Sequence, residues 1–201
     1  GREHLKLVQD TTQDKIESAR LAAWNAIAIL AAGDALPKLI QMHAMIGTDK
    51  DRQAAEKTIL SVAGRVSDKE KASSVLLEAM LNTAVPTRLS LLKMLGRIGH
   101  DRGLAAIREA VKDPDQQVAE AAFRALTEWT DMRAANDLLE IAGSSEQLVR
   151  QVLAIRSYVR LLSLPNTRPV KKSIKLYKKG LSASRRPEEK KLVIARLADL
   201  K

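Results

Sequence analysis

Apolar residues recur along this chain with the 3.6-residue period of a helix and not with the alternation of a strand. Four apolar runs stand out, and each is closed by an aspartate. The aspartates are spaced 34, 33 and 30 residues apart, at Asp34, Asp68, Asp101 and Asp131. The runs before them predict inner, buried helices over residues 21–30, 58–62, 91–95 and 121–126.

Each of these aspartates also opens a further helical stretch. An aspartate side chain can accept hydrogen bonds from the N–H groups of a first helical turn, which have no partner inside the helix. We therefore expect each aspartate to cap the helix that follows it. The aspartate spacing then marks the boundaries of a structural repeat.

A second break divides each unit into two helices. Proline occurs in several of these breaks and suits the first turn of a helix, where no donor is lost. About ten helices result, arranged as antiparallel pairs of roughly 34 residues, and such pairs must stack on their neighbours to bury a core. The breaks fall at residues 47–49, 84–87, 113–115, 143–146 and 184–188.

Composition supports an all-α chain. Apolar residues make up 45% of the 201 residues but aromatic residues only 2%, so the core must consist mainly of Ala, Leu, Ile and Val. Six prolines and nine glycines are too few for the tight turns of an all-β sandwich or barrel of this length.

Two segments resemble a known repeat family. Residues 95–107 (LGRIGHDRGLAAI) are similar to the core of HEAT and phycobilisome-lyase-type repeats, with a Leu-Gly-x-Ile-Gly run, an aspartate and a Leu-x-x-Leu pattern. Residues 113–118 (DPDQQV) and the helix after them resemble the inter-helix turn and inner helix of that family, although Ala119 stands where an arginine is usual. The resemblance favours HEAT over TPR repeats of similar period. It implies a right-handed α-α superhelix, a HEAT/armadillo-like solenoid of five to six helix pairs.

We accordingly expect residues 1–201 to form a single HEAT-repeat solenoid. A softer resemblance, over residues 125–129, 156–160 and 186–191, is to HEAT regions of large, often exported bacterial multidomain proteins. It implies an accessory domain, and it leaves a periplasmic or a cytoplasmic location open. The opening glycine and the uncapped apolar run 192–197 suggest a piece of a longer chain. The expected units are a partial repeat 1–33, repeats 34–67, 68–100, 101–130 and 131–164, and a terminal pair 165–201.

Positive charge is concentrated in the terminal pair. The formal net charge is +10, and residues 168–201 hold 12 Lys or Arg against three acidic residues, a balance of +9. Over residues 170–181 we expect an apolar stripe of Val170, Ile174, Tyr177 and Leu181. Five lysines fan across roughly 120° beside and behind it. They are Lys171, Lys172, Lys175, Lys178 and Lys179.

This lysine face has several open interpretations. It is a solvated outer face of a terminal repeat, or a binding surface for an acidic protein or sister domain, or a phosphate-binding surface for nucleic acid. Nothing in it reads bases.

The sequence lacks the residue patterns that are typical of catalytic and metal-binding sites. The chain has no cysteine, and His4, His43 and His100 lie in separate repeats without a second histidine or a carboxylate at metal-ligand spacing. Structural or surface roles are expected for all three. A glycine-rich phosphate loop and a Gly-x-Ser-x-Gly elbow are absent. We therefore expect no enzyme activity, no cofactor, no metal and no membrane span.

A HEAT-like DNA glycosylase is the sharpest enzymatic alternative, because such enzymes engage damaged DNA with aromatic and charged residues. The chain offers Trp24 and Trp129, and both lie in predicted inner-helix runs, which favours the core between repeats. Trp129 is also close in sequence to Asp131 and Arg133, so a tryptophan exposed at a rim stays open. A bilin lyase lacks any distinct substrate motif here.

The sequence thus predicts a non-catalytic HEAT-repeat scaffold or protein–protein or inter-domain interaction module. Nucleic-acid binding through the basic terminal pair is the alternative. An arginine ladder on the inner helices could instead cap helix carbonyls, and that interpretation is kept equally open. The expected contact residues are Arg65, Arg97, Arg124 and Arg160 on the inner helices, and Lys171, Lys175 and Lys179 on the basic face.

Overall fold

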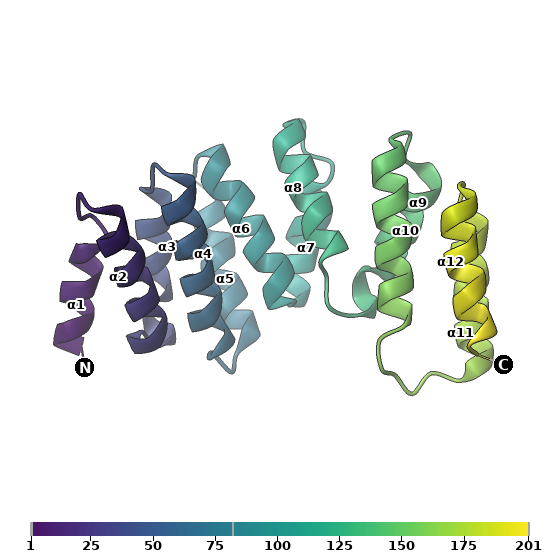
Figure 1. The fold of residues 1–201 in the computed structure, drawn as a ribbon, viewed down its shortest axis with the longest axis horizontal. Helices are drawn as coiled ribbons and strands as arrows, with labels where there is room; N and C mark the ends of the chain where they lie inside the picture. The colour runs from purple at the N-terminus through teal and green to yellow at the C-terminus, as the bar shows by residue number, and fades with distance from the viewer. Residues whose placement is uncertain (1, 82, 201) are drawn as a thin grey trace. The chain divides into compact units, whose positions relative to one another are not determined.

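The computed structural model describes residues 2–81 and 83–200 of the protein, and the regular structure in them is entirely helical. Twelve α-helices and two short 3-10 helices follow one another (Figure 1). In chain order they are α1 (Arg2–Thr11), α2 (Glu17–Leu30), η1 (Gly33–Ala35), α3 (Leu36–Ala44), α4 (Asp49–Gly64), α5 (Lys69–Met80), α6 (Val85–Ile98), α7 (Asp101–Ala110), α8 (Gln116–Thr127), η2 (Met132–Ala134), α9 (Ala135–Ser144), α10 (Leu148–Leu162), α11 (Val170–Ala183) and α12 (Pro187–Ala198).

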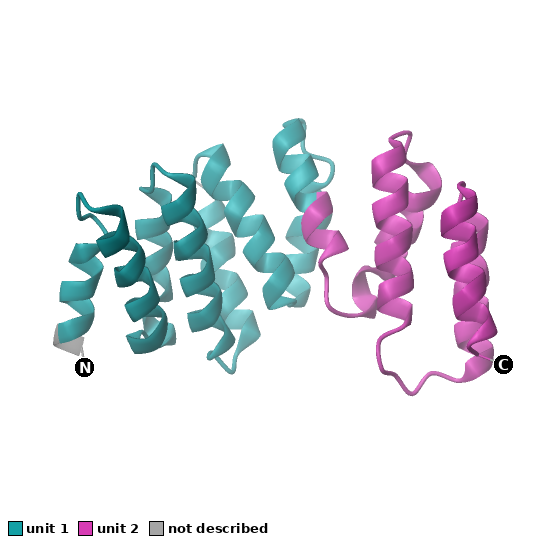
Figure 2. Ribbon diagram, in the orientation of Figure 1, with its two compact units in different colours: residues 1–122 teal, residues 123–201 magenta. Residues whose placement is uncertain are grey.

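The chain divides into two compact units, residues 1–122 and 123–201 (Figure 2). In the first unit α2, α4 and α6 pack side by side as an inner row, and α3, α5 and α7 form an outer row. Each of α3 and α5 also packs against the inner helix that follows it. Figure 1 shows this second layer behind the first. Three of the predicted inner helices, over residues 21–30, 58–62 and 91–95, are therefore inner helices in the structure. The fourth, over residues 121–126, lies in α8, which spans the boundary between the units.

The second unit repeats the same arrangement with four helices. Outer helix α9 pairs with inner helix α10, and outer helix α11 pairs with inner helix α12. The two pairs stack through α9 against α11 and α10 against α12. Because each pair alone leaves an apolar face uncovered, this stacking supplies the core of the unit.

Helix starts follow the predicted breaks, but not every aspartate is a cap. Asp68 caps α5 by accepting a hydrogen bond from the N–H of Lys71, and Asp131 caps η2 in the same way. The prediction is wrong for the other two. Asp34 lies inside η1, and Asp101 is the first residue of α7, whose N-cap is His100. One residue of shift in the turn is enough to pass the capping role to a neighbour.

At the other end of a helix, Gly99 closes α6. Its φ of 69° places it in the left-handed region, where an L side chain would clash, and its N–H bonds to the carbonyl of Leu95. The Leu-Gly-x-Ile-Gly run is thus a helix end.

The core consists mainly of Ala, Leu, Ile and Val, with all five aromatic side chains buried among them. Small alanines let the helices approach closely. The all-α helical-repeat class predicted from periodicity is confirmed. The single array over residues 1–201 stays a prediction.

Candidate interaction surfaces

Two arginines of the predicted ladder reach back to the preceding inner helix. Arg65, just after α4, donates from Nη2 to the carbonyl of Ala31 at the end of α2, at 2.7 Å. Arg160 on α10 donates to the carbonyls of Thr127 and Trp129, at 3.0 and 2.6 Å. The last carbonyls of a helix have no partner inside it, so each arginine satisfies groups that would otherwise need water. These bonds agree with the carbonyl-capping alternative, with the cap supplied by the following helix.

The other two ladder arginines are also engaged. Arg97 and Arg124 lie on exposed positions of α6 and α8, and each interacts with another residue of the chain. A role in partner contact for the four arginines stays a prediction.

Ion pairs join successive inner helices, and sequence reasoning missed them. Arg20 of α2 meets Asp51 of α4 with 2.9 Å between Nε and Oδ2. Glu56, also on α4, accepts from Lys93 and from the hydroxyl of Ser90 on α6, at 2.7 and 2.6 Å. The partners stand 31, 34 and 37 residues apart, close to one repeat length. Opposite charges at that spacing are the signal that could have revealed them.

The second unit has an equivalent pair. Arg156 of α10 donates to Glu189 of α12 at 2.9 Å, and Glu189 is only 2% exposed. A carboxylate at such burial needs a cation, and removal of one partner would leave a desolvated charge. The charged residues of the inner helices therefore hold repeats together, and few of them stand free to meet a ligand.

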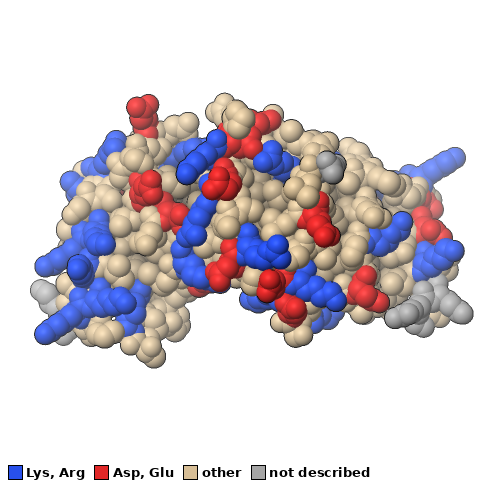
Figure 3. Space-filling model, turned by 180° about the vertical axis from the view of Figure 1, so that it is seen from behind, with Lys and Arg blue, Asp and Glu red and all other residues tan. Residues whose placement is uncertain are grey.

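The lysines of α11 behave differently. All five of them, at positions 171, 172, 175, 178 and 179, are exposed, and none pairs with a residue in the described part of the chain. In Figure 3, blue side chains gather over the end of the second unit that carries α11 and α12. We call these five side chains the lysine face.

The buried side of α11 is not the stripe predicted from its apolar residues. Ser173, Tyr177 and Gly180 are buried, whereas Val170 is 52% exposed. Only Tyr177 belongs to both sets. Gly180 lies against Tyr158 and Ile155 of α10, and its lack of a side chain allows the two helices to approach closely. The lysines still lie on the opposite, solvent side.

Both tryptophans are core residues. Trp24 is 1% and Trp129 0% exposed, so an exposed tryptophan at a rim is ruled out for Trp129. Its indole N–H donates to Asp131 at 3.1 Å, and the Arg133 guanidinium lies 5.7 Å from its ring centre. Hydrogen bonds from Arg133 lower the pKa of Asp131 to about 2. With every aromatic side chain buried, no surface for base stacking is present.

The histidines lie apart, as expected. His4 is exposed, His100 caps α7, and His43 is fully buried on α3. Among the described residues, no group of acidic or histidine side chains is arranged to hold a metal ion. A search of the described helices finds none with the length and apolar character needed to cross a bilayer.

A comparison with known protein families supports the arrangement of the helices in repeated pairs. Residues 73–156 match the family model of HEAT repeats. The match supports HEAT-type repeats in this segment, which contains the residues 95–107 and 113–118 that resemble the family in sequence. No curated protein sequence shows a significant match.

One solved structure is similar over the full length. It is the archaeal HEAT-like repeats protein from Thermococcus onnurineus NA1, with 16% identity and a TM-score of 0.43. The match covers 100% of this chain and 87% of that one.

Proposed function

We propose that this helical-repeat protein is a non-catalytic scaffold that binds an acidic protein surface through the lysine face of α11. The observation that carries the proposal is the set of five exposed lysines without an internal partner. Lys171 and Lys179 are eight residues apart, so the face extends for about 12 Å along the helix. A patch of that size matches a short acidic segment.

Like-charge crowding supports a role in binding. Five ammonium groups on one 14-residue helix repel one another and destabilise it slightly, and a negatively charged partner would remove that cost. We further propose that the chain serves as an accessory domain of a bacterial protein.

Nucleic acid is the weaker partner for the same face. The lysine face contains no arginine to pair with guanine and no aromatic side chain to stack on a base. Outer helix α9, which packs against α11, exposes Glu140, so the outer surface of the second unit is not uniformly positive. A short acidic protein segment needs a smaller positive surface than a long polyanion does.

The test compares two probes, a fluorescent Asp/Glu-rich peptide and a DNA duplex, by anisotropy across a salt titration. The wild-type protein should bind the peptide at low salt. A variant with Lys171→Glu, Lys175→Glu and Lys179→Glu should bind it at least about tenfold more weakly, since several charge contacts reverse sign.

The matched control carries Lys38→Glu, Lys69→Glu and Lys71→Glu, which changes the net charge equally at exposed positions of the first unit. It should retain peptide binding within about threefold, because screening weakens distant charges. Equal losses in the two variants, or tighter binding of DNA than of the peptide at every salt concentration, would overturn the proposal.

A further inference from the structure

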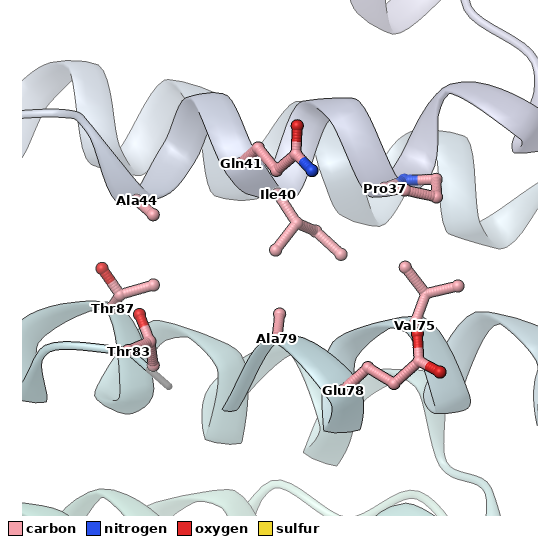
Figure 4. Close-up of a pocket in the computed structure, with 9 residues that line it drawn as sticks. All are labelled: Pro37, Ile40, Gln41, Ala44, Val75, Glu78, Ala79, Thr83 and Thr87. Atoms are coloured by element: carbon pink, nitrogen blue, oxygen red, sulfur yellow. The ribbon is translucent and has the colours of Figure 1, made fainter. Parts of the chain in front are cut away.

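A groove runs between outer helices α3 and α5 of the first unit (Figure 4). Its volume is 360 Å³, and its lining is more apolar than polar. In the close-up Ile40 points from α3 toward α5, and Val75 and Ala79 point back from α5. The remaining lining residues are Pro37, Gln41, Ala44, Glu78, Thr83 and Thr87.

The groove exists because small residues stand where the two helices face each other. Ala44 and Ala79 each leave the volume that a larger side chain would fill, while Ile40 forms an apolar floor that is only 3% exposed. The stretch from Pro37 to Ala44 is about two helical turns, or roughly 10 Å, long. That length accommodates two or three side chains of a ligand.

Two large exposed apolar residues lie next to groove-lining residues in the sequence. Met45 follows Ala44 at the end of α3 and is 72% exposed, and Leu81 follows α5 and is 78% exposed. They occupy the same position, the C-cap, in successive outer helices. Exposed aliphatic side chains at a groove are typical of a protein interaction site, and the flexible methionine adapts to different partners.

A helical ligand suits this groove better than an extended one. The walls are helices, whose interior N–H and C=O groups are already paired, so they offer no backbone partner to a strand. A peptide that enters as a helix satisfies its own backbone and brings apolar side chains at i, i+3 or i+4, and i+7 to one side.

The negative charge on the groove wall favours a ligand with a basic residue. Glu78 is the only ionisable lining residue; it is exposed and forms no ion pair with the described residues. A lysine or arginine of the ligand would pair with it. The hydroxyls of Thr83 and Thr87 make no hydrogen bond within the described chain and offer further acceptors at the Ala44 end (Figure 4).

We infer that the α3–α5 groove binds an amphipathic α-helix of a partner protein, with two or three aliphatic side chains in the groove and a basic residue against Glu78. This surface belongs to the first unit and is independent of the lysine face.

The experiment uses a synthetic helical peptide of about 15 residues, built on alanine and glutamine, with leucines at i, i+4 and i+7 and one arginine beside them. A matched peptide has glutamate in place of the arginine. Methyl NMR of the full chain follows the methionines. The Met45 signal should shift on addition of the arginine peptide, and the signal of Met94, which is fully buried in α6, should not.

Three variants test the assignment. Ala79→Arg, which fills the groove, should abolish the Met45 shift, whereas Ala105→Arg at an exposed position of α7 should leave it unchanged. The wild type should prefer the arginine peptide by about twofold to fivefold, the range of an exposed ion pair. Glu78→Lys should invert that preference.

Absence of a Met45 shift with both peptides would overturn the inference. So would binding that survives Ala79→Arg, or a peptide preference that Glu78→Lys leaves unchanged.

Discussion

At the scale of single residues, His43 carries a cost that nothing in its surroundings offsets. It is fully buried on α3, and neither ring nitrogen has a hydrogen-bond partner. Its pKa is lowered from 6.5 to about 4, mainly by burial and to a smaller extent by the positive charge of Arg52, which outweighs the opposing effect of Glu56. The imidazole is therefore neutral in the folded protein at pH 5, while in the unfolded chain it is protonated.

This difference predicts a pH dependence of the free energy of unfolding. Because the unfolded state binds a proton near pH 6.5 and the folded state only near pH 4, stability is complete above about 6.5 and falls as the pH drops toward 4. Between pH 7 and pH 5 the loss due to His43 should be about 2 kcal/mol.

Urea unfolding of the wild type and of His43→Leu, measured at both pH values, isolates this contribution. Since the imidazole makes no hydrogen bond, the leucine variant should unfold at pH 7 with a free energy equal to or above that of the wild type. A variant that loses as much stability at pH 5 as the wild type would contradict the assignment.

At the scale of elements, the contact between α10 and α11 depends on a glycine. A methyl group added at Gly180 would lie 2.9 Å from Cε1 and 3.2 Å from Cδ1 of Tyr158. The ring cannot move away easily, because Tyr158 is 1% exposed and its hydroxyl donates to the carbonyl of Leu176 at 2.8 Å. Burial also raises the pKa of Tyr158 to about 12, so it stays a donor at neutral pH.

Gly180→Ala should therefore destabilise the protein by about 1–2 kcal/mol, because overpacking exceeds the gain in helix propensity. Gly143→Ala on α9 is the matched control in the same unit: no atom lies within 4 Å of the added methyl group. That variant should be unchanged or more stable by up to about 1 kcal/mol. Thermal and urea denaturation measure both, and equal stability of the two variants would argue against the close contact.

At the scale of the whole molecule, the two units differ in charge. Residues 1–122 contain 17 basic and 16 acidic residues, a balance of +1, whereas residues 123–201 contain 17 and eight, a balance of +9. Self-repulsion weakens a compact state, and salt screens it. The second unit should gain stability from salt and the first should not.

Hydrogen exchange followed by mass spectrometry resolves the units in the intact chain. From about 20 mM to about 300 mM NaCl, amides of α11 and α12 should exchange roughly twofold to fivefold more slowly, and those of α3 to α6 should change little. Replacement of Lys171, Lys175 and Lys179 by glutamine should reduce the effect. Equal slowing in both units would indicate a general effect of salt and not relief of repulsion.

Local pattern alone predicted the helical pairs, most of the breaks between them, three helices of the inner row and the exposure of the lysines of α11. It favoured burial of both tryptophans but left an exposed Trp129 open, and it predicted about ten helices where the structure has twelve in its described residues. These features depend on the 3.6-residue period and on proline and glycine positions, which act within a few residues. The sequence also marked Arg65 and Arg160 as members of a ladder.

Tertiary structure decided what these residues touch. The reach of Arg65 to Ala31, the burial of His43, the close approach of α11 to Tyr158 and the groove beside Ala79 all depend on neighbours from another helix. Local periodicity shows that a helix has an apolar side. Which of its residues are buried, and where space is left between helices, depends on the neighbouring helix against which it packs.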